Sequence, residues 1–352
     1  MADISLESVS FTYPGAAYAT LRELDLRVAD GSTHALLGAS GAGKTTILNI
    51  LCGLLQPTQG RILFNERDVS ALGARERNVA LVFQFPVLYE SKSVLDNLTF
   101  PLRNRGWSEE DAVRRARDVA SDLEISDVLS ARPSELSLFQ KQLTAIAKSL
   151  VRTDVDLVLL DEPLTAVEPA MKWRLRQTLS RYQAHHKLTM IYVTHDQTEA
   201  LTFASRVSVM ADGCILQTGT PEEIYNAPTD EFVGNFIGSP GMQFYSNEAL
   251  RGLVTLTGAE SSESTPSPIT ARSRIGLRAE WLNPDRHDAG PWEVVGKRLL
   301  GTHQGSPKSL LTLRHGELEV FARALAHWDI GDRASLRAGR WLNLHSGAHD
   351  AK

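Results

Sequence analysis

The sequence predicts an α/β chain with a mixed, largely parallel sheet, followed by a small β-barrel. Short apolar runs, such as residues 156–160 and 189–195, alternate with helical stretches, which is typical of a parallel sheet covered on both faces. A mostly helical stretch over residues 86–150 interrupts this alternation and is expected to form a subdomain. After about residue 245, short strand-like runs are separated by Gly, Pro and Asp, which indicates a small antiparallel barrel.

The length of the chain also favours two domains, because 352 residues exceed the roughly 100–200 that one domain holds. We place the first domain over residues 1–240, with its helical subdomain at about 86–150, and the second over residues 241–352. Residues 258–272 are rich in Ser, Thr, Pro and Glu, and we expect them to form a surface loop of the second domain.

Apolar periodicity predicts the elements of the first domain in order. Strands are expected at residues 4–13, 21–28, 32–38, 78–84, 156–160 and 189–195. Helices are expected at residues 47–55, from Ser108, from near Ser137, and at residues 171–186. Ser108 is a predicted N-cap, because acidic residues fill the next turn and apolar residues follow at helical spacing.

The second domain shows six short strand-like runs. They cover residues 274–282, 292–301, 309–315, 318–325, 333–339 and 341–347. Trp292, Trp328 and Trp341 lie in or between these runs, and we expect them to be core aromatics and not a ligand site.

Composition excludes several classes of protein. The 37 Lys and Arg residues against 42 Asp and Glu give a net charge of −5, which is no signature of nucleic-acid binding. No apolar stretch approaches the roughly 20 residues that span a bilayer, and the N-terminus does not resemble a signal peptide. A disulfide between Cys52 and Cys214 could not by itself stabilise a chain of this size, so the cysteines give no sign of a disulfide framework. This favours a reducing compartment.

Residues 38–45, Gly-Ala-Ser-Gly-Ala-Gly-Lys-Thr, match the phosphate-loop pattern G-x-x-x-x-G-K-[ST] between a predicted strand and a predicted helix. Backbone N–H groups of such a loop surround the β-phosphate of a nucleotide. Lys44 would reach the β- and γ-phosphates, Thr45 would ligate Mg²⁺, and Thr46 would touch the α-phosphate. The candidate residues are Gly38, Ser40, Gly41, Ala42, Gly43, Lys44, Thr45 and Thr46. A chance glycine turn is the alternative.

Two acids end the apolar run at 156–160. Asp161 suits the Mg²⁺ shell, and Glu162 is placed to polarise an attacking water as general base. A strand end capped by solvated acids is the alternative, and the phosphate loop upstream argues against it.

Together with four further features, these residues resemble the ATP-binding subunit of an ABC transporter. Tyr13 matches the aromatic that stacks on adenine, Gln84 matches the Q-loop, and His195 matches the switch histidine. Residues 135–142, ELSLFQKQ, stand where the family has its LSGGQ signature. The resemblance implies a head-to-tail dimer in which each ATP lies between one subunit's phosphate loop and the other's signature.

The resemblance also implies a role for each candidate. Lys44, Gln84, Glu162 and His195 would be catalytic: His195 would hold the γ-phosphate, and Gln84 would join Thr45 and Asp161 around Mg²⁺. The implied fold is a P-loop NTPase ABC cassette followed by a barrel of the oligonucleotide/oligosaccharide-binding type. Residues 219–242 and 275–282 resemble the corresponding segments of carbohydrate importers, with Ala279 where proline is usual.

The signature departs from the family, because Ser137 and Gln140 remain but Leu138 and Phe139 replace both glycines. Glu168 also stands where the family has Asp. Since a glycine lets backbone approach a phosphate without a Cβ in the way, this chain's signature should serve a partner's ATP poorly. We therefore expect a heterodimer with a second ATPase that carries an intact signature.

The function expected is ATP hydrolysis that powers import of a carbohydrate, a polyol or a glycerol phosphate. Residues 82–90 and 194–204 look closest to glycerol or glycerol-phosphate importers. Expected partners are membrane permeases, docked on residues 85–90 and 95–102, and indirectly an extracytoplasmic solute-binding protein. The chain would then be peripheral on the cytoplasmic face of the inner membrane. The alternatives are a soluble non-transport ABC ATPase, an importer ATPase for a polyamine or an inorganic anion, and a P-loop kinase or GTPase.

Overall fold

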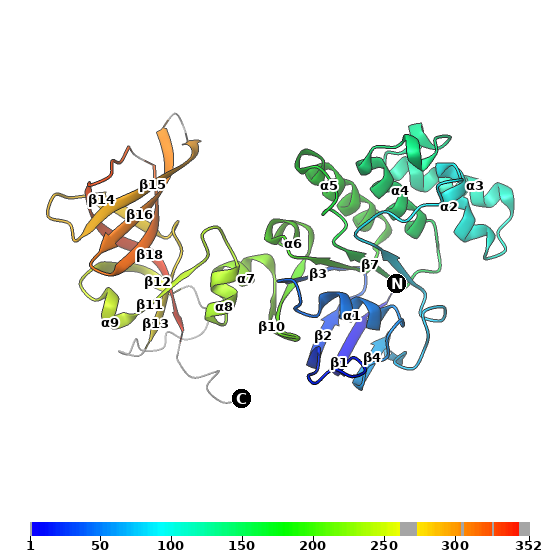
Figure 1. Cartoon of the computed structure of the whole chain (residues 1–352), viewed down its shortest axis with the longest axis horizontal. Coiled ribbons are helices and arrows are strands. Elements are labelled where there is room, and N and C mark those ends of the chain that lie inside the picture. Colours follow the sequence, from blue (N-terminus) through cyan, green and yellow to red (C-terminus); the bar gives the residue numbers. More distant parts are fainter. Residues whose placement is uncertain (1, 261–272, 304–305, 326, 345–352) are drawn as a thin grey trace. The chain divides into compact units, whose positions relative to one another are not determined.

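The computed structural model describes residues 2–260, 273–303, 306–325 and 327–344 (Figure 1). Its contacts divide the chain into two compact units, Met1–Pro221 and Glu222–Lys352. This division precedes residue 240, where the sequence analysis placed the domain boundary. Most of the surface loop expected over residues 258–272 lies outside the described residues.

The first unit contains two sheets. A four-stranded antiparallel sheet has the order β2-β1-β4-β5. A six-stranded sheet has the order β10-β9-β3-β8-β7-β6, in which all neighbours are parallel except β10 and β9. The strands are β1 (Ile4–Phe11), β2 (Leu21–Val28), β3 (Thr33–Gly38), β4 (Gln59–Phe64), β5 (Arg67–Asp68), β6 (Val79–Val82), β7 (Leu157–Asp161), β8 (Met190–Thr194), β9 (Arg206–Ala211) and β10 (Cys214–Gly219).

The helices of the first unit confirm the predicted insertion between β6 and β7. They are α1 (Lys44–Leu51), α2 (Val94–Arg103), α3 (Glu109–Asp122), α4 (Leu138–Leu150), α5 (Pro169–His186) and α6 (Gln197–Phe203), with 3₁₀ turns η1 (Ser126–Val128) and η2 (Pro133–Glu135). The side chain of Ser108 caps α3 by accepting a hydrogen bond from the Asp111 N–H, as the sequence predicted. Figure 1 shows α2, α3 and α4 grouped together at one end of the unit.

The core of the first unit explains why these strands are so apolar. Every residue of β3 and β8 is buried, and so are the first four residues of β7. Strands buried on both faces are mostly apolar, and a polar residue within them is paired, as His34 is with Ser208 at 2.8 Å. Exposed and half-buried polar groups follow the carboxyl ends of the strands. The fold thus places the candidate catalytic and binding residues at one edge of the sheet.

The second unit is a nearly closed, mostly antiparallel sheet. Its short helices are α7 (Pro221–Asn226), α8 (Glu231–Phe236) and α9 (Asn247–Leu250). Its strands are β11 (Gln243–Ser246), β12 (Val254–Glu260), β13 (Arg274–Leu277), β14 (Leu282–Arg286), β15 (Trp292–His303), β16 (Ser306–His315), β17 (Leu318–Ala324) and β18 (Arg333–Leu344). The sheet order is β11-β13-β18-β15-β16-β17, and β12 and β14 also pair with β18.

Two details of this barrel-like sheet differ from the prediction. The pairing of β12 with β18 is parallel. The runs predicted at 333–339 and 341–347 join in one strand, β18, up to residue 344, and residues 345–347 lie outside the described residues. The pairing of β18 with β12 shifts register beside Gly339, but β18 continues through this glycine. Trp292 and Trp328 are buried in the core of this unit, and Trp341 packs against that core, so their place in the core is confirmed, although Trp328 also lines a cavity.

Candidate active site

Four parallel strands of the first unit end at the same edge of their sheet. The register pairs Val82 of β6 with Leu160 of β7, Asp161 with Val193 of β8, and β8 with β3. This edge therefore contains the phosphate loop, which follows β3, and Gln84, which follows β6. It also contains the two acids at the end of β7, and His195, which follows β8. Ligands of open parallel sheets bind outside the carboxyl ends of the strands, which makes this edge the candidate site.

The phosphate loop (residues 38–45) leads directly into α1. Gly43 is the N-cap of α1, with φ of 97°, and no side chain caps this helix end. A Cβ at Gly43 would lie 2.6 Å from Leu21 Cδ2, and Gly41 also has a positive φ of 85°. Both positions therefore require glycine, and the first N–H groups of α1 stay available to an anion.

Lys44 is 6% exposed and folds back over its own loop. Its Nζ donates to Gly38 O at 2.7 Å and to Ala39 O at 2.9 Å. Burial lowers the pKa of Lys44, although Glu162 and Asp161 oppose this shift. Burial and the neighbouring Glu162 carboxylate raise the pKa of Asp161, which Lys44 opposes. The two acids repel each other, so the site would gain from a cation between them.

The remaining loop residues and Tyr13 surround the start of α1. Ser40 and Thr45 are exposed, whereas Ala42 and Thr46 are buried. The Tyr13 hydroxyl lies 3.3 Å from Thr46 Oγ1, and the Tyr13 ring is partly exposed and meets Phe11 edge-on, with centroids 4.8 Å apart. The structure thus brings Tyr13, predicted from the resemblance alone, beside the phosphate loop.

Glu162 and His195 are in contact. Glu162 Oε2 lies 3.0 Å from His195 Nδ1 and accepts a hydrogen bond from Thr165 Oγ1, also at 3.0 Å. The Glu162 backbone is left-handed, with φ of 44°, and its N–H donates to Val193 O of β8 at 2.9 Å. A left-handed conformation costs about 1–2 kcal/mol in a residue other than glycine, and such strain clusters at functional sites.

A buried carboxylate behind His195 was not singled out by the sequence patterns. Glu199 is 2% exposed and accepts hydrogen bonds from Tyr192 Oη at 3.0 Å and from Thr194 Oγ1 at 3.0 Å. Lys172 of α5 donates to its other oxygen at 2.9 Å. The same Thr194 hydroxyl accepts the Asp196 N–H at 2.9 Å, so this network fixes the backbone on both sides of His195.

The signature segment, residues 136–140, forms the start of α4. The Ser137 side chain accepts the Gln140 N–H at 3.2 Å, and Gln140 Oε1 accepts the Ser137 N–H at 3.0 Å. This capping box occupies two N–H groups of the helix start. Leu138 is 46% exposed, and the Phe139 ring is partly buried, 5.8 Å from the Arg174 guanidinium. Glu168, at the start of α5, is exposed.

Comparison with known proteins identifies the family of the chain. Residues 21–165 match the family model of the ABC transporter. A Jannaschia protein named sn-glycerol-3-phosphate import ATP-binding protein UgpC is 37% identical over 314 residues, which are 86% of this chain and 88% of the relative. A Yersinia pestis protein of the same name is 34% identical over 92% of this chain and 94% of the relative. The chain belongs to the ABC transporter ATP-binding proteins.

Solved structures agree with this assignment of the first unit. CbiO1 of Clostridium perfringens, part of an ABC transporter complex, has a TM-score of 0.60 at 26% identity, covering 63% of this chain and 89% of CbiO1. A dimeric bacterial ABC transporter cassette has a TM-score of 0.55 at 26% identity, covering 62% of this chain and 98% of that one. The enzyme is therefore an ABC-type ATPase. Among the described residues, no helix of this ABC ATPase is both long and apolar enough to cross a membrane.

Proposed function

We propose that this ATPase powers the import of a small polar solute, and that the solute is glycerol 3-phosphate or a close analogue. The observation that carries the proposal is likeness over almost the whole chain, barrel included, to relatives named for sn-glycerol-3-phosphate import. A non-transport ABC ATPase, or an importer for a polyamine or an inorganic anion, has no comparable support.

ATP would bind at the edge of the six-stranded sheet. The Tyr13 ring is exposed enough to stack on adenine, and the uncapped start of α1 presents N–H groups to the phosphates. Lys44 would exchange the carbonyls of Gly38 and Ala39 for phosphate oxygens. Thr45, Gln84 and Asp161 offer the oxygen ligands that Mg²⁺ prefers, and Mg²⁺ bound there would neutralise charge on the transferred phosphoryl group.

Hydrolysis would depend on Glu162 and His195. Both the His195 and the Thr165 contacts fall on Glu162 Oε2, which leaves Oε1 to orient a water. Since a carboxylate only accepts, His195 Nδ1 donates to Glu162 and its Nε2 faces away from that bond, free to contact the γ-phosphate. These groups position the water and stabilise charge, which is most of what phosphoryl transfer needs.

We further propose that the working dimer is a heterodimer with a second ABC ATPase. Leu138 and Phe139 place side chains where a partner's ATP would approach, whereas Ser137 and Gln140, which form the capping box, are the signature residues that remain. The chain's own phosphate loop, Glu162 and His195 remain assembled. One competent site would then form from these residues and the intact signature of the partner subunit.

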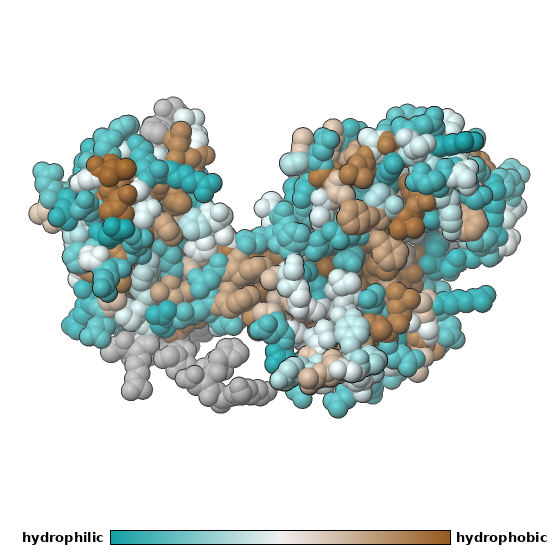
Figure 2. Space-filling view, viewed as in Figure 1, coloured by the Kyte–Doolittle hydropathy of each residue, from teal (hydrophilic) through white to brown (hydrophobic). Residues whose placement is uncertain are grey.

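The segment after β6 would dock the permeases. Phe83, Phe85, Val87 and Tyr89 are all exposed, Phe85 at 65%. Val87 and Pro101 line a depression of about 250 Å³ next to Lys148, whose Nζ lies 4.0 Å from the centre of the Tyr89 ring. Figure 2 shows that apolar surface on the first unit is gathered in patches between hydrophilic areas. An apolar groove with aromatic anchors suits a partner helix, and it would hold the chain on the cytoplasmic membrane face.

Reconstitution tests the solute directly. The chain is placed in liposomes with the partner ATPase and permeases that co-purify with it, and a solute-binding protein is added. We expect sn-glycerol 3-phosphate to stimulate ATP hydrolysis and to accumulate inside, and the Glu162→Gln variant to do neither. Stimulation by a polyamine or an inorganic anion, with none by glycerol 3-phosphate, would contradict the assignment.

A further inference from the structure

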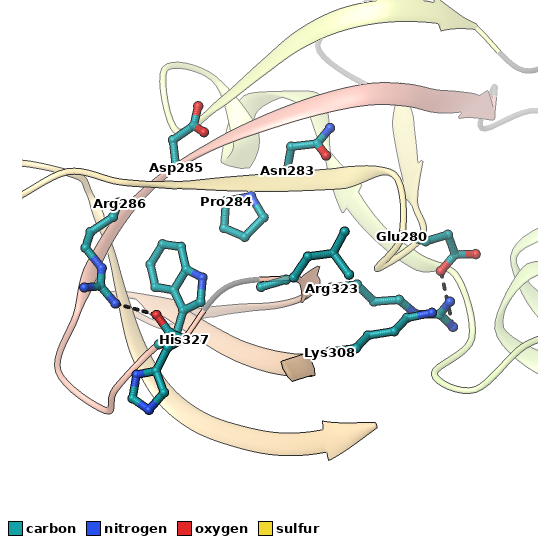
Figure 3. Close-up of a pocket in the computed structure, with 11 residues that line it drawn as sticks. Glu280, Asn283, Pro284, Asp285, Arg286, Lys308, Arg323 and His327 are labelled. Carbon is teal, nitrogen blue, oxygen red and sulfur yellow. Dashed lines mark hydrogen bonds and ion pairs between the residues drawn. The ribbon is translucent and has the colours of Figure 1, made fainter. Parts of the chain in front are cut away.

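The second unit contains a cavity that the proposed ATPase mechanism does not use (Figure 3). Its volume is about 790 Å³, within the range of small-molecule sites. The described residues that line it are Glu280, residues 283–286 of β14, Lys308 of β16, residues 323–325 at the end of β17, His327 and Trp328. Three of the lining residues are Arg or Lys and two are acids, so the pairing of these charges decides what the cavity can bind.

Both acids are already engaged. Asp285 forms an ion pair with Arg337 of β18, and its carboxylate points away from the labelled cations in Figure 3. Glu280 accepts a hydrogen bond from the Tyr225 hydroxyl. Neither acid therefore fully neutralises the cations that line the cavity.

Two of those cations make no side-chain hydrogen bond to any described residue. Arg323 forms a long ion pair with Glu280, whose Oε2 lies 3.7 Å from Nη2, beyond hydrogen-bond distance (Figure 3). The Arg323 Nε is buried without an acceptor. Lys308 has no ion pair with a described residue, and its side chain extends in the same direction as that of Arg323 in Figure 3. Buried donors are ordinarily satisfied, so the buried Arg323 Nε suggests a missing acceptor, and the partly exposed Lys308 ammonium beside it adds a second positive charge.

The rest of the lining suits a short carbon body. Arg286 is held by His327 O at 2.8 Å and by Asp332 Oδ2 at 2.6 Å, and its guanidinium lies 5.2 Å from the centre of the Trp328 ring. Because Arg286 is already paired with Asp332, it lines the cavity together with Leu325 without needing an anion of its own. The cavity thus combines one end with two incompletely paired cations and another to which Pro284, Leu325 and Trp328 contribute apolar surface.

We propose that this cavity binds a small organic anion whose phosphate or carboxylate group is held by Lys308 and Arg323. A planar guanidinium beside an ammonium matches an oxyanion, since both donate several hydrogen bonds. The carbon body of the anion contacts Leu325 and Trp328. This site is separate from the nucleotide phosphate loop and does not depend on which solute the transporter carries.

Calorimetry on the full chain tests the site. The chain is saturated with ADP and Mg²⁺, so that the phosphate loop is filled, and is then titrated with sn-glycerol 3-phosphate, D-glycerate, inorganic phosphate or glycerol. We expect one or both organic anions to bind at least about tenfold more tightly than inorganic phosphate, and glycerol not to bind. Preference for the phosphate ester or the carboxylate identifies the anionic group.

Matched variants locate the binding. Lys308→Gln should weaken binding of the preferred organic anion about tenfold or more, and Lys308→Gln/Arg323→Gln should abolish it. Arg298→Gln removes an exposed cation of β15 outside the cavity and should leave the affinity unchanged. Thermal unfolding checks that each variant folds; Lys308→Gln, which removes no hydrogen bond, remains informative if the double variant does not fold. No binding by the wild-type chain, or equal affinity in Lys308→Gln, would overturn the proposal.

Discussion

Two helices of the first unit begin in opposite ways. Helix α1 begins after Gly43, whose positive φ and missing side chain leave the first N–H groups uncapped. Helix α4 begins after Ser137, whose capping box with Gln140 uses N–H groups that a bare helix start would offer. Leu138 adds an exposed side chain there. An open helix start binds phosphate, whereas a capped and covered one is stable without a ligand.

The contrast supports the proposed division of functions within this chain. Its own nucleotide would meet the open start of α1 and the assembled pair Glu162 and His195. A partner's nucleotide would meet the covered start of α4. The phosphate loop and the signature of one subunit are therefore expected to differ in how well they support ATP hydrolysis, and the following changes test that difference.

The largest effect is expected from Glu162→Gln in the assembled transporter. Removing a general base should lower turnover by about 10²–10⁴-fold while ATP binding persists. Steady-state ATPase assays and nucleotide binding measure the two separately. Glu110→Gln, in an exposed acid of α3, is the control and should hydrolyse normally. Unimpaired turnover by Glu162→Gln would remove Glu162 from catalysis.

The next effect concerns the signature. Leu138→Gly/Phe139→Gly removes the side chains that cover the start of α4, so a partner's phosphate can approach the backbone. We expect ATPase activity of the chain alone to rise about tenfold, as measured by phosphate release against protein concentration. Robust ATP hydrolysis by the unmodified chain alone would show instead that Leu138 and Phe139 do not impair the function of the signature.

A smaller effect is expected from Glu199→Gln. This change keeps the size of the side chain but removes the charge that Lys172 neutralises, so the backbone around His195 should be held less firmly. We expect kcat to fall several-fold, up to about tenfold, with KM for ATP nearly unchanged. A lower Tm with an unchanged kcat would assign Glu199 a purely structural role.

The smallest effect is on the stability of the nucleotide-free chain. Because the folded-state pKa of Asp161 is raised, its contribution to stability is present at low pH and is lost as pH rises through that pKa. Asp161→Asn should therefore raise Tm at pH 7, on the order of 2–4 °C, with a gain that shrinks toward pH 4. Asp118→Asn, in an exposed acid of α3, should show no such dependence. A lower Tm of the Asp161→Asn variant than of the wild-type chain at pH 7 would contradict the inferred repulsion between Asp161 and Glu162.

The sequence predicted those parts of the site that local patterns encode. The phosphate loop has a fixed spacing, and Asp161, Glu162 and His195 follow apolar strands whose ends must meet. The Glu199 network could not be predicted in this way, because Lys172 is brought to it by packing of α5 and not by any local spacing. The unbroken β18 was missed because a glycine with ordinary extended backbone looks like a turn signal in sequence.

Mixing two variants of this chain tests most directly whether the signature is the defective part. One is the wild-type chain; the other carries Lys44→Ala together with Leu138→Gly/Phe139→Gly, so it offers a restored signature but no working phosphate loop. In a mixed dimer, the wild-type Glu162 and His195 would meet that restored signature. We predict that the mixture hydrolyses ATP several-fold faster than the sum of its components, while a mixture with Lys44→Ala alone does not. A rate equal to that sum would contradict the proposed division of labour between the two helix starts.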